Sequence, residues 1–411
     1  MKFSTIVIGD ELLIGQVTDT NSGWIARHMA PLGWEPLSVR VIADDAAQIK
    51  LAIDQAFAST DLVLMTGGIG PTKDDITKQT LLSYFGGEMV LHEQSRRNVD
   101  EMFARRGIAM NELTAQQAMV PSSCQVILNE VGTAPIMWFE QGNKVLVSMP
   151  GVPHETRTMM ERAVIPRIVK RFHSDVDVEY RTMVVIDYAE SALAEKLAPL
   201  EQQLPSYIHL AYLPEQGIIR LRLTGTHASH EVLNADMDRI SQQLHKILGS
   251  CIIADADKPL AQIVGERLRK HQLTLSTAES CTGGNIAHKI TEIAGSSDYF
   301  MGSVVSYSND VKHRVLGVDQ TVLDTCGAVS QPVVEQMVAG ACNVCHTNCA
   351  VATSGVAGPG GGTPDKPVGT VWMAARVGDV TVSRCHHFNG SRAQIIDRAT
   401  THALIMLLHL L

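Results

Sequence analysis

The chain has 411 residues, of which 45% are hydrophobic, and its formal net charge is −9 at pH 7. This length predicts two or three domains of roughly 150 residues each, and the hydrophobic fraction is ample for their cores. The acidic balance and the lack of a visible basic stripe argue against a general polyanion binder, because phosphate contacts need clustered lysines and arginines.

The sequence shows no leader peptide and no membrane span. A positively charged start followed by an apolar core and a cleavage site is not found. No uninterrupted apolar run reaches the roughly 18 residues of a membrane helix, and the apolar residues 403–411 predict a buried final helix. We therefore expect a cytoplasmic protein without a membrane partner, whose eight cysteines are reduced thiols.

The first 170 residues predict an α/β domain. Strand-like runs at residues 4–8, 62–65 and 144–148 alternate with helical patterns such as 46–58. This alternation is typical of a parallel sheet covered by helices. We assign residues 1–170 to this domain.

Acidic residues lie at the predicted strand ends of this domain, beside the glycine-rich turn 67–70. Carboxylates suit a hard divalent cation that bridges to phosphates, and the paired glycines can cradle a diphosphate. The alternative is that these acids cap helices and turns. The predicted diphosphate and metal site consists of Asp10, Glu11, Asp19, Asn21, Gly67, Gly68, Gly70, Asp74, Asp75 and Thr77, with Asp10, Asp74 and Asp75 as the metal ligands.

Residues 171–255 change character and predict a small α+β connector domain. Strands are expected at residues 180–186, 207–212 and 218–223, and helices at 189–197 and 228–248. The following segment, 255–259, has the composition of a linker. The third domain is therefore expected to comprise residues 256–411.

The third domain carries candidate nucleophiles beside two glycines, in the heptapeptide 278–284, Ala-Glu-Ser-Cys-Thr-Gly-Gly. A short strand is predicted before it and a helix from residue 285, so Ser280 is expected at a strand-to-helix turn. The backbone amides of a helix start can hold a phosphate or the oxyanion of a tetrahedral intermediate. A simple serine or threonine cap with turn glycines is the alternative.

Two more polar clusters follow predicted strands of this domain. Residues 307–312 come after the strand 303–306, and the glycine-rich run 353–364 comes after the strand 350–352. The carboxyl ends of the strands in a parallel α/β sheet form the ligand crevice. The three clusters are therefore expected to converge on one site, which would make a hydrolase.

Three cysteines stand close together near the end of a predicted helix. Cys342, Cys345 and His346 have the spacing of a haem attachment motif, and Cys349 would complete a three-thiol metal set. Residues 331–341 predict a helix, however, and attachment of c-type haem needs export. We interpret these cysteines as buried thiols on a helix face.

The motifs of the chain resemble those of the CinA family, whose carboxyl domain is a nicotinamide-nucleotide amidase also called PncC. In the third domain they are residues 278–284, Tyr-Ser-Asn-x-x-Lys at 307–312 and the run 353–371. Residues 9–15, 19–21 and 66–77 resemble the same family's first domain, which is related to molybdopterin-binding folds. The resemblance covers essentially the whole chain. It implies a molybdopterin-binding-like three-layer α/β domain, an α+β connector and an α/β amidase domain.

For the third domain, the resemblance implies hydrolysis of nicotinamide mononucleotide to nicotinate mononucleotide and ammonia without a cofactor. Ser280 is expected to attack the carboxamide carbon, Lys312 to act as the base, and Tyr307 to assist by hydrogen bonding. Cys281 is the competing nucleophile, because a thiolate is intrinsically stronger, and Arg392 is expected to clamp the phosphate. Further substrate-binding residues are expected at Thr282, Gly283, Gly284, Asn309, Thr353, Ser354, Gly355, Gly360 and Gly361.

For the first domain, the resemblance implies an ADP-ribose pyrophosphatase that uses a divalent ion such as Mg, Mn or Co, or else a molybdopterin-type pocket without chemistry. The expected partners are these small nucleotides and a second copy in a homodimer, with no direct contact to nucleic acid. The family's historical name refers to competence for DNA uptake. The alternative function is therefore an adaptor for recombination proteins with a non-catalytic first domain.

Overall fold

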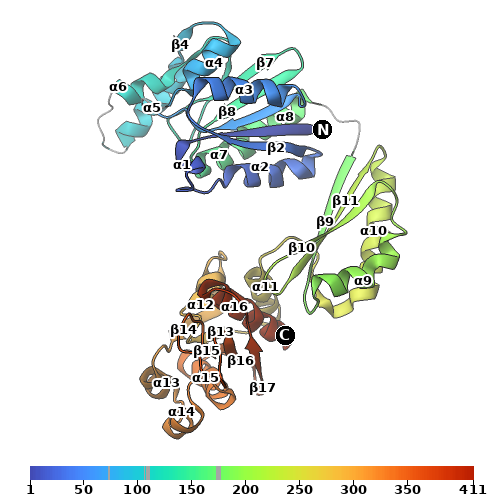
Figure 1. The fold of residues 1–411 in the computed structure, drawn as a ribbon, viewed down its shortest axis with the longest axis vertical. Coiled ribbons are helices and arrows are strands. Elements are labelled where there is room, and N and C mark those ends of the chain that lie inside the picture. Colours follow the sequence, from blue (N-terminus) through green and yellow to red (C-terminus); the bar gives the residue numbers. More distant parts are fainter. Residues whose placement is uncertain (73–74, 106, 108–111, 173–176) are drawn as a thin grey trace. The chain divides into compact units, whose positions relative to one another are not determined.

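The computed structural model describes residues 1–72, 75–105, 107, 112–172 and 177–411. Contacts between residues divide the chain into two compact units. The first comprises residues 1–179 and 226–233, and the second comprises 180–225 and 234–411. Both units combine helices and strands (Figure 1), so the α/β class expected from the sequence is confirmed.

A six-stranded sheet of order β2-β1-β3-β8-β7-β6 forms the centre of the first unit. Its strands are β1 (Lys2–Ile8), β2 (Glu35–Ile42), β3 (Leu62–Thr66), β6 (Gln125–Ile127), β7 (Ile136–Gln141) and β8 (Lys144–Met149). The strands β2, β1, β3 and β8 are parallel as expected, whereas β7 runs antiparallel to both of its neighbours, β8 and β6. The sheet is therefore mixed, because β7 and β8 are joined by a turn too short for a parallel crossover.

Helices cover both faces of this sheet. Leu62 and Leu64 of β3 pack in a core with Trp24 of α2 (Asn21–Met29), whereas the alternate residues Val63 and Met65 pack in a second core with α3 (Ala46–Phe57). Figure 1 shows α2 and α3 on opposite faces. The other helices are α1 (Asp10–Leu13), α4 (Thr77–Phe85), α5 (Glu93–Arg105), α6 (Glu112–Ala115), α7 (Pro153–Met159) and α8 (Ile165–Arg171), and β4 (Met89–Leu91) pairs with β5 (Met119–Pro121). The first unit is thus a three-layer α/β structure.

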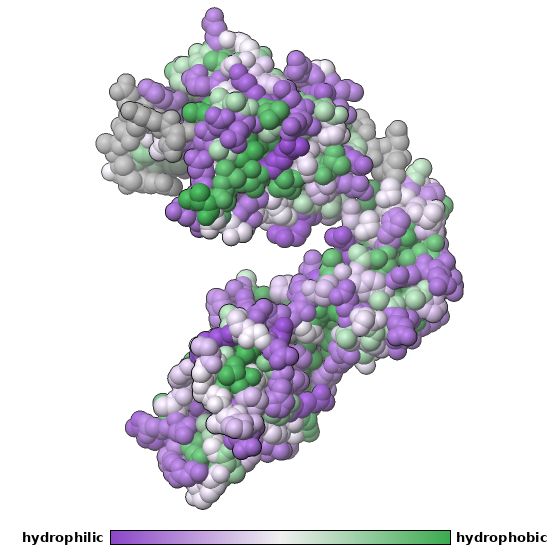
Figure 2. Space-filling model, viewed as in Figure 1, coloured by the Kyte–Doolittle hydropathy of each residue, from purple (hydrophilic) through white to green (hydrophobic). Residues whose placement is uncertain are grey.

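Exposed apolar side chains gather on one face of the first unit. Figure 2 shows them over α1 and toward β2, the edge strand of the sheet. The residues are Leu13, Ile14 and Val17 after the start of α1, and Leu37, Val39 and Val41 on alternate positions of β2. Alternate residues of a regular strand share a face, so Val39 and Val41 lie on the same face, whereas Leu37 stands at a register shift of β2.

A four-stranded sheet of order β10-β11-β9-β12 lies mostly in the second unit. Its strands are β9 (Asp177–Val185), β10 (Ile208–Pro214), β11 (Ile219–His227) and β12 (Ile252–Ala254), and its helices are α9 (Glu190–Glu201) and α10 (His230–Leu248). The pairs β10–β11 and β12–β9 are antiparallel. These elements lie where the sequence predicts the small α+β region.

A five-stranded sheet of order β14-β13-β15-β16-β17 forms the rest of the second unit. Its strands are β13 (Leu275–Glu279), β14 (Phe300–Val305), β15 (Cys349–Gly355), β16 (Thr370–Val377) and β17 (Val380–His387). The helices are α11 (Leu260–His271), α12 (Asn285–Thr291), α13 (Asn309–Leu316), α14 (Gln320–Cys326), α15 (Gln331–Cys345) and α16 (Arg392–Leu408). Because β14, β13 and β15 are parallel, their carboxyl ends meet at one edge of the sheet.

This second sheet is also buried on both faces. Val351 of β15 packs in a core with Leu407 of α16, whereas Ala350 and Ala352 pack in a core with Met337 of α15. The end of α16 is buried, as the apolar run 403–411 predicts. None of the helices in the described part of the chain is long and apolar enough to cross a membrane.

The cysteines do not form disulfides in this structure. Cys342 and Cys345 lie on α15 and Cys349 begins β15, and each is a free thiol. Burial raises the pKa of the Cys349 thiol to about 12, which keeps this thiol protonated near neutral pH. Among the residues that the structure describes, no three histidine, cysteine or acidic side chains are placed to hold a metal ion.

Candidate functional site

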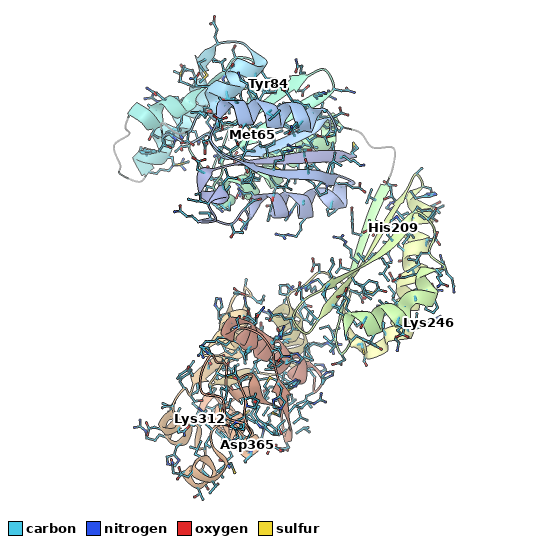
Figure 3. All side chains as sticks on the ribbon, in the orientation of Figure 1. Met65, Tyr84, His209, Lys246, Lys312 and Asp365 are labelled. Carbon is cyan, nitrogen blue, oxygen red and sulfur yellow. The ribbon has the colours of Figure 1, made fainter. Side chains whose placement is uncertain are left out.

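The polar centre of the second unit is a serine–lysine pair. Strand β13 ends at Glu279, so Ser280 opens the turn that leads to α12, and Lys312 lies on α13. The side chain of Ser308 caps α13 by accepting a hydrogen bond from the Val311 amide. This geometry places Lys312 Nζ 3.0 Å from Ser280 Oγ. Figure 3 labels Lys312 in this part of the chain.

Lys312 is an unusual lysine because its side chain is only 1% exposed. Its Nζ donates a hydrogen bond to the Ser306 carbonyl oxygen at 2.6 Å. Desolvation lowers the pKa of Lys312 to about 8, because burial disfavours the charged form. A sizeable fraction of this amine is therefore neutral near pH 8, and a neutral amine can accept the proton of Ser280.

The three polar clusters expected to converge do meet in one pocket of about 260 Å³. It is lined by Ser280, Cys281, Tyr307, Asn309, Lys312, Ala328, Val329, Ser354, Gly355, Ala357 and Arg392. Cys281 thus shares the pocket, but burial raises the pKa of its thiol to about 12. A thiol with so high a pKa is a poor source of thiolate, so the serine is the better candidate nucleophile.

Arg392 connects the loops of Tyr307 and Gly358 at this pocket by hydrogen bonds. Arg392 donates from Nη2 to the Tyr307 hydroxyl at 2.9 Å and from Nη1 to the Gly358 carbonyl at 2.7 Å. The Tyr307 side chain is 63% exposed. A guanidinium has five N–H donors, so Arg392 holds these loops with two donors and has others for an anionic ligand.

Several predicted substrate-binding residues build the turn and do not line the pocket. The Gly283 amide donates to the Ser280 carbonyl at 3.1 Å, and the Gly284 amide donates to the Glu279 carboxylate at 3.0 Å. These two amides are therefore not aimed at a ligand, contrary to our prediction of an anion site there. The physical reason is that the turn folds back on the carboxylate at its start.

Four more of the predicted substrate-binding residues, two threonines and two glycines, do not line the pocket. The hydroxyls of Thr282 and Thr353 hydrogen-bond to each other at 2.7 Å, and both residues are buried away from the pocket. Gly360 and Gly361 are exposed and do not line it. Gly355 does line the pocket, and a Cβ there would lie 2.7 Å from the Thr370 carbonyl oxygen. Glycine at 355 is thus required by close backbone packing.

The sequence analysis missed the apolar wall of this pocket. Ala328 and Val329 come from the connection between α14 and α15, and Ala357 comes from the loop after β15. The Ser354 hydroxyl donates to the Ala328 carbonyl at 2.7 Å and so fixes the wall. Small apolar residues outside a motif carry no signal of their own, so this wall becomes visible with the tertiary structure.

The first unit has a larger pocket, of about 470 Å³, at the carboxyl ends of its parallel strands. Of the predicted residues it contains Glu11, Asp19, Asn21, Gly67, Gly68, Gly70 and Asp75. Asp10 and Thr77 do not line it, and Asp74 lies outside the described residues. The predicted metal set of Asp10, Asp74 and Asp75 is therefore not assembled by the described part of the chain.

Two of the predicted acids cap local structure, as the alternative interpretation holds. Asp19 Oδ1 accepts the Asn21 and Ser22 amides at 2.9 and 3.2 Å. Asp75 accepts the Gly70 amide at 2.8 Å and the Thr72 amide at 2.9 Å. These carboxylates shape the pocket wall while their remaining lone pairs can face a ligand.

The glycines after β3 are needed for close packing. Gly67 has φ of +101°, and a Cβ there would lie 2.1 Å from the Ile8 carbonyl oxygen of β1. Gly68 has φ of +65°, and its Cβ would lie 2.2 Å from Thr77 Oγ1. Side chains at these positions would push the turn away from β1, so the glycines let the backbone form the pocket floor.

The lining of this first-unit pocket is strongly acidic. Two acids that the sequence analysis missed, Asp44 and Glu155, join Glu11, Asp19 and Asp75, and no Lys, Arg or His lines the pocket among the described residues. Three buried oxygens in its wall, Asn21 Oδ1, Thr66 Oγ1 and Gln117 Oε1, have no hydrogen-bond partner within the described protein. Carboxylate and amide oxygens are the ligands that hard cations prefer. The donors therefore suit a divalent cation in their chemistry, whereas no three acids of the described residues are close enough together to hold one.

Comparison with known proteins gives matches along nearly the whole chain. It matches the CinA C-terminal domain over residues 257–411, a probable molybdopterin binding domain over 4–170 and the damage-inducible protein CinA KH domain over 180–254. The solved structure of the competence/damage inducible protein CihA from Agrobacterium tumefaciens is 41% identical, over 37% of this chain and 93% of that chain, with a TM-score of 0.36.

Two relatives are similar to this chain over most of its length. A CinA-like protein from Cytophaga hutchinsonii is 42% identical over 373 residues, which are 90% of this chain and 88% of the relative. A CinA-like protein from Flavobacterium psychrophilum is 39% identical over 411 residues, which are 99% of this chain and 98% of the relative. With identity of this extent over both chains, the protein belongs to the CinA family.

Proposed function

We propose that the second unit is an amidohydrolase that converts nicotinamide mononucleotide to nicotinate mononucleotide and ammonia. The observation that carries this proposal is the 3.0 Å contact between Ser280 Oγ and the buried Lys312 Nζ. A nucleophile held against a base of lowered pKa is the arrangement that acyl transfer needs. The pocket's small apolar wall and its Arg392 suit a flat ring that carries a phosphorylated sugar.

The proposed reaction has two steps, both served by Lys312. Neutral Lys312 takes the proton of Ser280 as Oγ attacks the carboxamide carbon, and the resulting ammonium gives that proton to the leaving nitrogen. Ammonia departs and an ester to Ser280 remains. Lys312 then takes a proton from water, whose oxygen attacks the ester, and returns it to Ser280 as the nicotinate forms. No cofactor takes part.

The proposed binding mode divides the pocket into polar and apolar parts. Ala328, Val329 and Ala357 pack against the pyridine ring, and Asn309 binds the carboxamide beside Ser280. Arg392, near Tyr307, binds the phosphate. Phosphate recognition by a planar guanidinium is strong because two parallel N–H donors can be used.

The test is release of ammonia from nicotinamide mononucleotide by the purified protein. Ser280→Ala is expected to release none above background, and Cys281→Ala is expected to retain activity within about threefold, because a thiol of raised pKa is not the nucleophile. Full activity in Ser280→Ala with loss in Cys281→Ala would reverse the assignment. Inactivity of the folded wild type would reject the amidase.

We further propose that the first unit hydrolyses the diphosphate of ADP-ribose with a divalent metal ion. The pocket with five carboxylates and no described basic residue supports this, because an anionic substrate can enter it together with a neutralising cation. Such an ion would supply Lewis-acid activation of a phosphoryl oxygen, and the residues that would hold it are among the pocket's acids, which are Glu11, Asp19, Asp44, Asp75 and Glu155.

The test for this second activity is formation of AMP from ADP-ribose with Mg²⁺, Mn²⁺ or Co²⁺. Glu11→Gln is expected to lower the rate at least about tenfold, since it removes a potential ligand charge. No AMP with any of these ions would remove the proposal. If the folded protein forms neither AMP nor ammonia, a binding role such as the adaptor function is favoured.

A further inference from the structure

A fully buried carboxylate precedes the proposed nucleophile. Glu279, the last residue of β13, is fully buried. Its Oε2 accepts the Gly284 and Ile286 amides at 3.0 Å each, and its Oε1 accepts the Ala287 amide at 2.9 Å and the Thr277 hydroxyl at 3.2 Å. Burying a carboxylate is costly unless its lone pairs are satisfied, and the three backbone amides supply most of what this group needs, because the Thr277 hydroxyl also lies 2.6 Å from Ser303 Oγ.

The amide donors to Glu279 lie on the other side of the turn that contains Ser280. The three amides come from residues 284–287, so the carboxylate of Glu279 binds the chain on the far side of the turn that contains Ser280. The Ser280 amide donates to the Thr353 carbonyl at 3.0 Å. Ser280 is thus fixed from both sides, by strand β15 and by its neighbour's carboxylate.

The backbone of Glu279 also connects the two members of the pair. The Ser306 amide donates to the Glu279 carbonyl at 2.8 Å, and the Ser306 carbonyl accepts from Lys312 Nζ at 2.6 Å. The side chain of Glu279 therefore holds the segment that carries the nucleophile, and its carbonyl holds the segment that carries the base. Glu279 therefore fixes the position of the Ser280 segment relative to the Lys312 segment.

The Glu279 carboxylate is not a direct partner of Lys312 among the described residues. The hydrogen bonds of Lys312 go to Ser280 Oγ and the Ser306 carbonyl, and no ion pair joins Lys312 to Glu279 among the described residues. A direct carboxylate partner would stabilise the ammonium form and remove the base. The amides of the turn take up the carboxylate's charge instead, which leaves Lys312 free to act as a base.

We infer that Glu279 is a positioning residue, whose carboxylate holds the 280–287 turn so that Ser280 Oγ stays in reach of Lys312 Nζ. This inference rests on the proposed amidase. Glu279→Gln keeps the size of the side chain but turns an NH₂ group toward amide donors, which forces the turn to shift. Because a misplacement of about 1 Å can reduce the rate by about 100-fold, a small shift is sufficient for a large loss.

The experiment compares Glu279→Gln with Glu292→Gln, a matched change of an exposed glutamate at the end of α12. Three quantities are measured: kcat and KM for nicotinamide mononucleotide across pH, the rate at which a fluorophosphonate labels Ser280, and the thermal unfolding midpoint. We expect Glu279→Gln to lower kcat and the labelling rate by about 100-fold. We expect KM and the pH midpoint of the rate to stay unchanged, and Glu292→Gln to behave as wild type.

A second variant covers the case in which Glu279→Gln does not fold. Thr277→Val removes the hydroxyl that lies 3.2 Å from Glu279 Oε1 and 2.6 Å from Ser303 Oγ, and it is expected to lower kcat several-fold with an unchanged KM. Folded variants with wild-type kcat and labelling rate would overturn the inference. So would a loss of activity that merely follows the unfolded fraction, because that indicates a role in stability alone.

The labelling assay separates this inference from the proposed function. If the wild type labels at Ser280 but leaves nicotinamide mononucleotide intact, the substrate proposal fails and the labelling rates of the variants still decide the role of Glu279. If the wild type releases ammonia and Glu279→Gln matches it, the inference alone fails. If Ser280 neither labels nor supports ammonia release in the folded wild type, both fail.

Discussion

The two pockets of this chain share a topological position and differ in charge. Each lies at the carboxyl ends of parallel strands beside glycine-rich turns. The second-unit pocket is lined by Lys312 and Arg392 with no acid among its described lining residues, whereas five acids and no described base line the first-unit pocket. The lysine and arginine of the second-unit pocket can supply a base and bind an anion without an added ion. The acids of the first-unit pocket need a cation before an anionic ligand can bind there. Topology thus selects where ligands bind, and side-chain charge selects the chemistry.

The largest expected effect comes from removing the base of the second-unit pocket. Lys312→Met is expected to lower kcat for nicotinamide mononucleotide by about 10³–10⁴-fold, as loss of a general base does. It is also expected to raise the free energy of unfolding at pH 7 by on the order of 1–3 kcal/mol, because a buried ammonium is replaced by an apolar group. Ammonia release and denaturant unfolding are the measurements. An active, less stable variant would contradict the assigned role.

Metal removal is expected to abolish the activity proposed for the first-unit pocket and to leave that of the second-unit pocket unchanged. Chelation should lower AMP formation from ADP-ribose at least about 100-fold, since the acidic pocket then lacks a neutralising cation. The same treatment should leave ammonia release unchanged, because Lys312 and Ser280 need no ion. Both products are measured on one chelated sample, before and after Mn²⁺ is restored. Loss of both activities after chelation would contradict the prediction that only the first-unit pocket needs a metal ion.

Removing the guanidinium at the pocket of the second unit is expected to have a more selective effect. Arg392→Ala should raise KM for nicotinamide mononucleotide by about 10–100-fold, as loss of a charge-assisted contact does. The riboside, which has no phosphate, should be affected much less. Arg392→Lys is the matched control, because it keeps the charge but not the planar fork. Equal rates on the nucleotide and the riboside in the wild type would count against the phosphate contact.

The smallest expected effect is the pH dependence of the amidase. Burial lowers the pKa of Lys312 to about 8, and the neutral amine is the active form. The value of kcat/KM should therefore rise about tenfold between pH 7 and pH 9 and then level off. Stability should rise between about pH 8 and 10.5, because the unfolded chain binds the extra proton there. A rate that falls through this range would contradict the lysine base.

The sequence analysis located the catalytic candidates of the second-unit site, but six of its predicted substrate-binding residues do not line the pocket. Ser280, Tyr307, Asn309 and Lys312 follow predicted strands, and all four line the pocket. In the first unit, the same reasoning found Glu11 and several other lining residues but included Asp10, which lies outside the pocket. It also missed acids that are far from the glycine motif in the chain. A motif shows where a strand ends, but not which way each side chain after it points.

Sequence alone determined the α/β class and the segments that meet at the strand ends, but not the antiparallel strands β6, β7, β16 and β17. The class and the segments depend on hydrophobic periodicity and on turn residues, which are local properties. The tertiary structure decided that the Gly283 and Gly284 amides turn inward to Ser280 and to the Glu279 carboxylate. It also decided that Lys312 is buried, that Ala328 and Val329 form a wall, and that Asp44 and Glu155 share a pocket. Burial and hydrogen-bond direction depend on packing between distant segments, and such packing is defined by the complete fold.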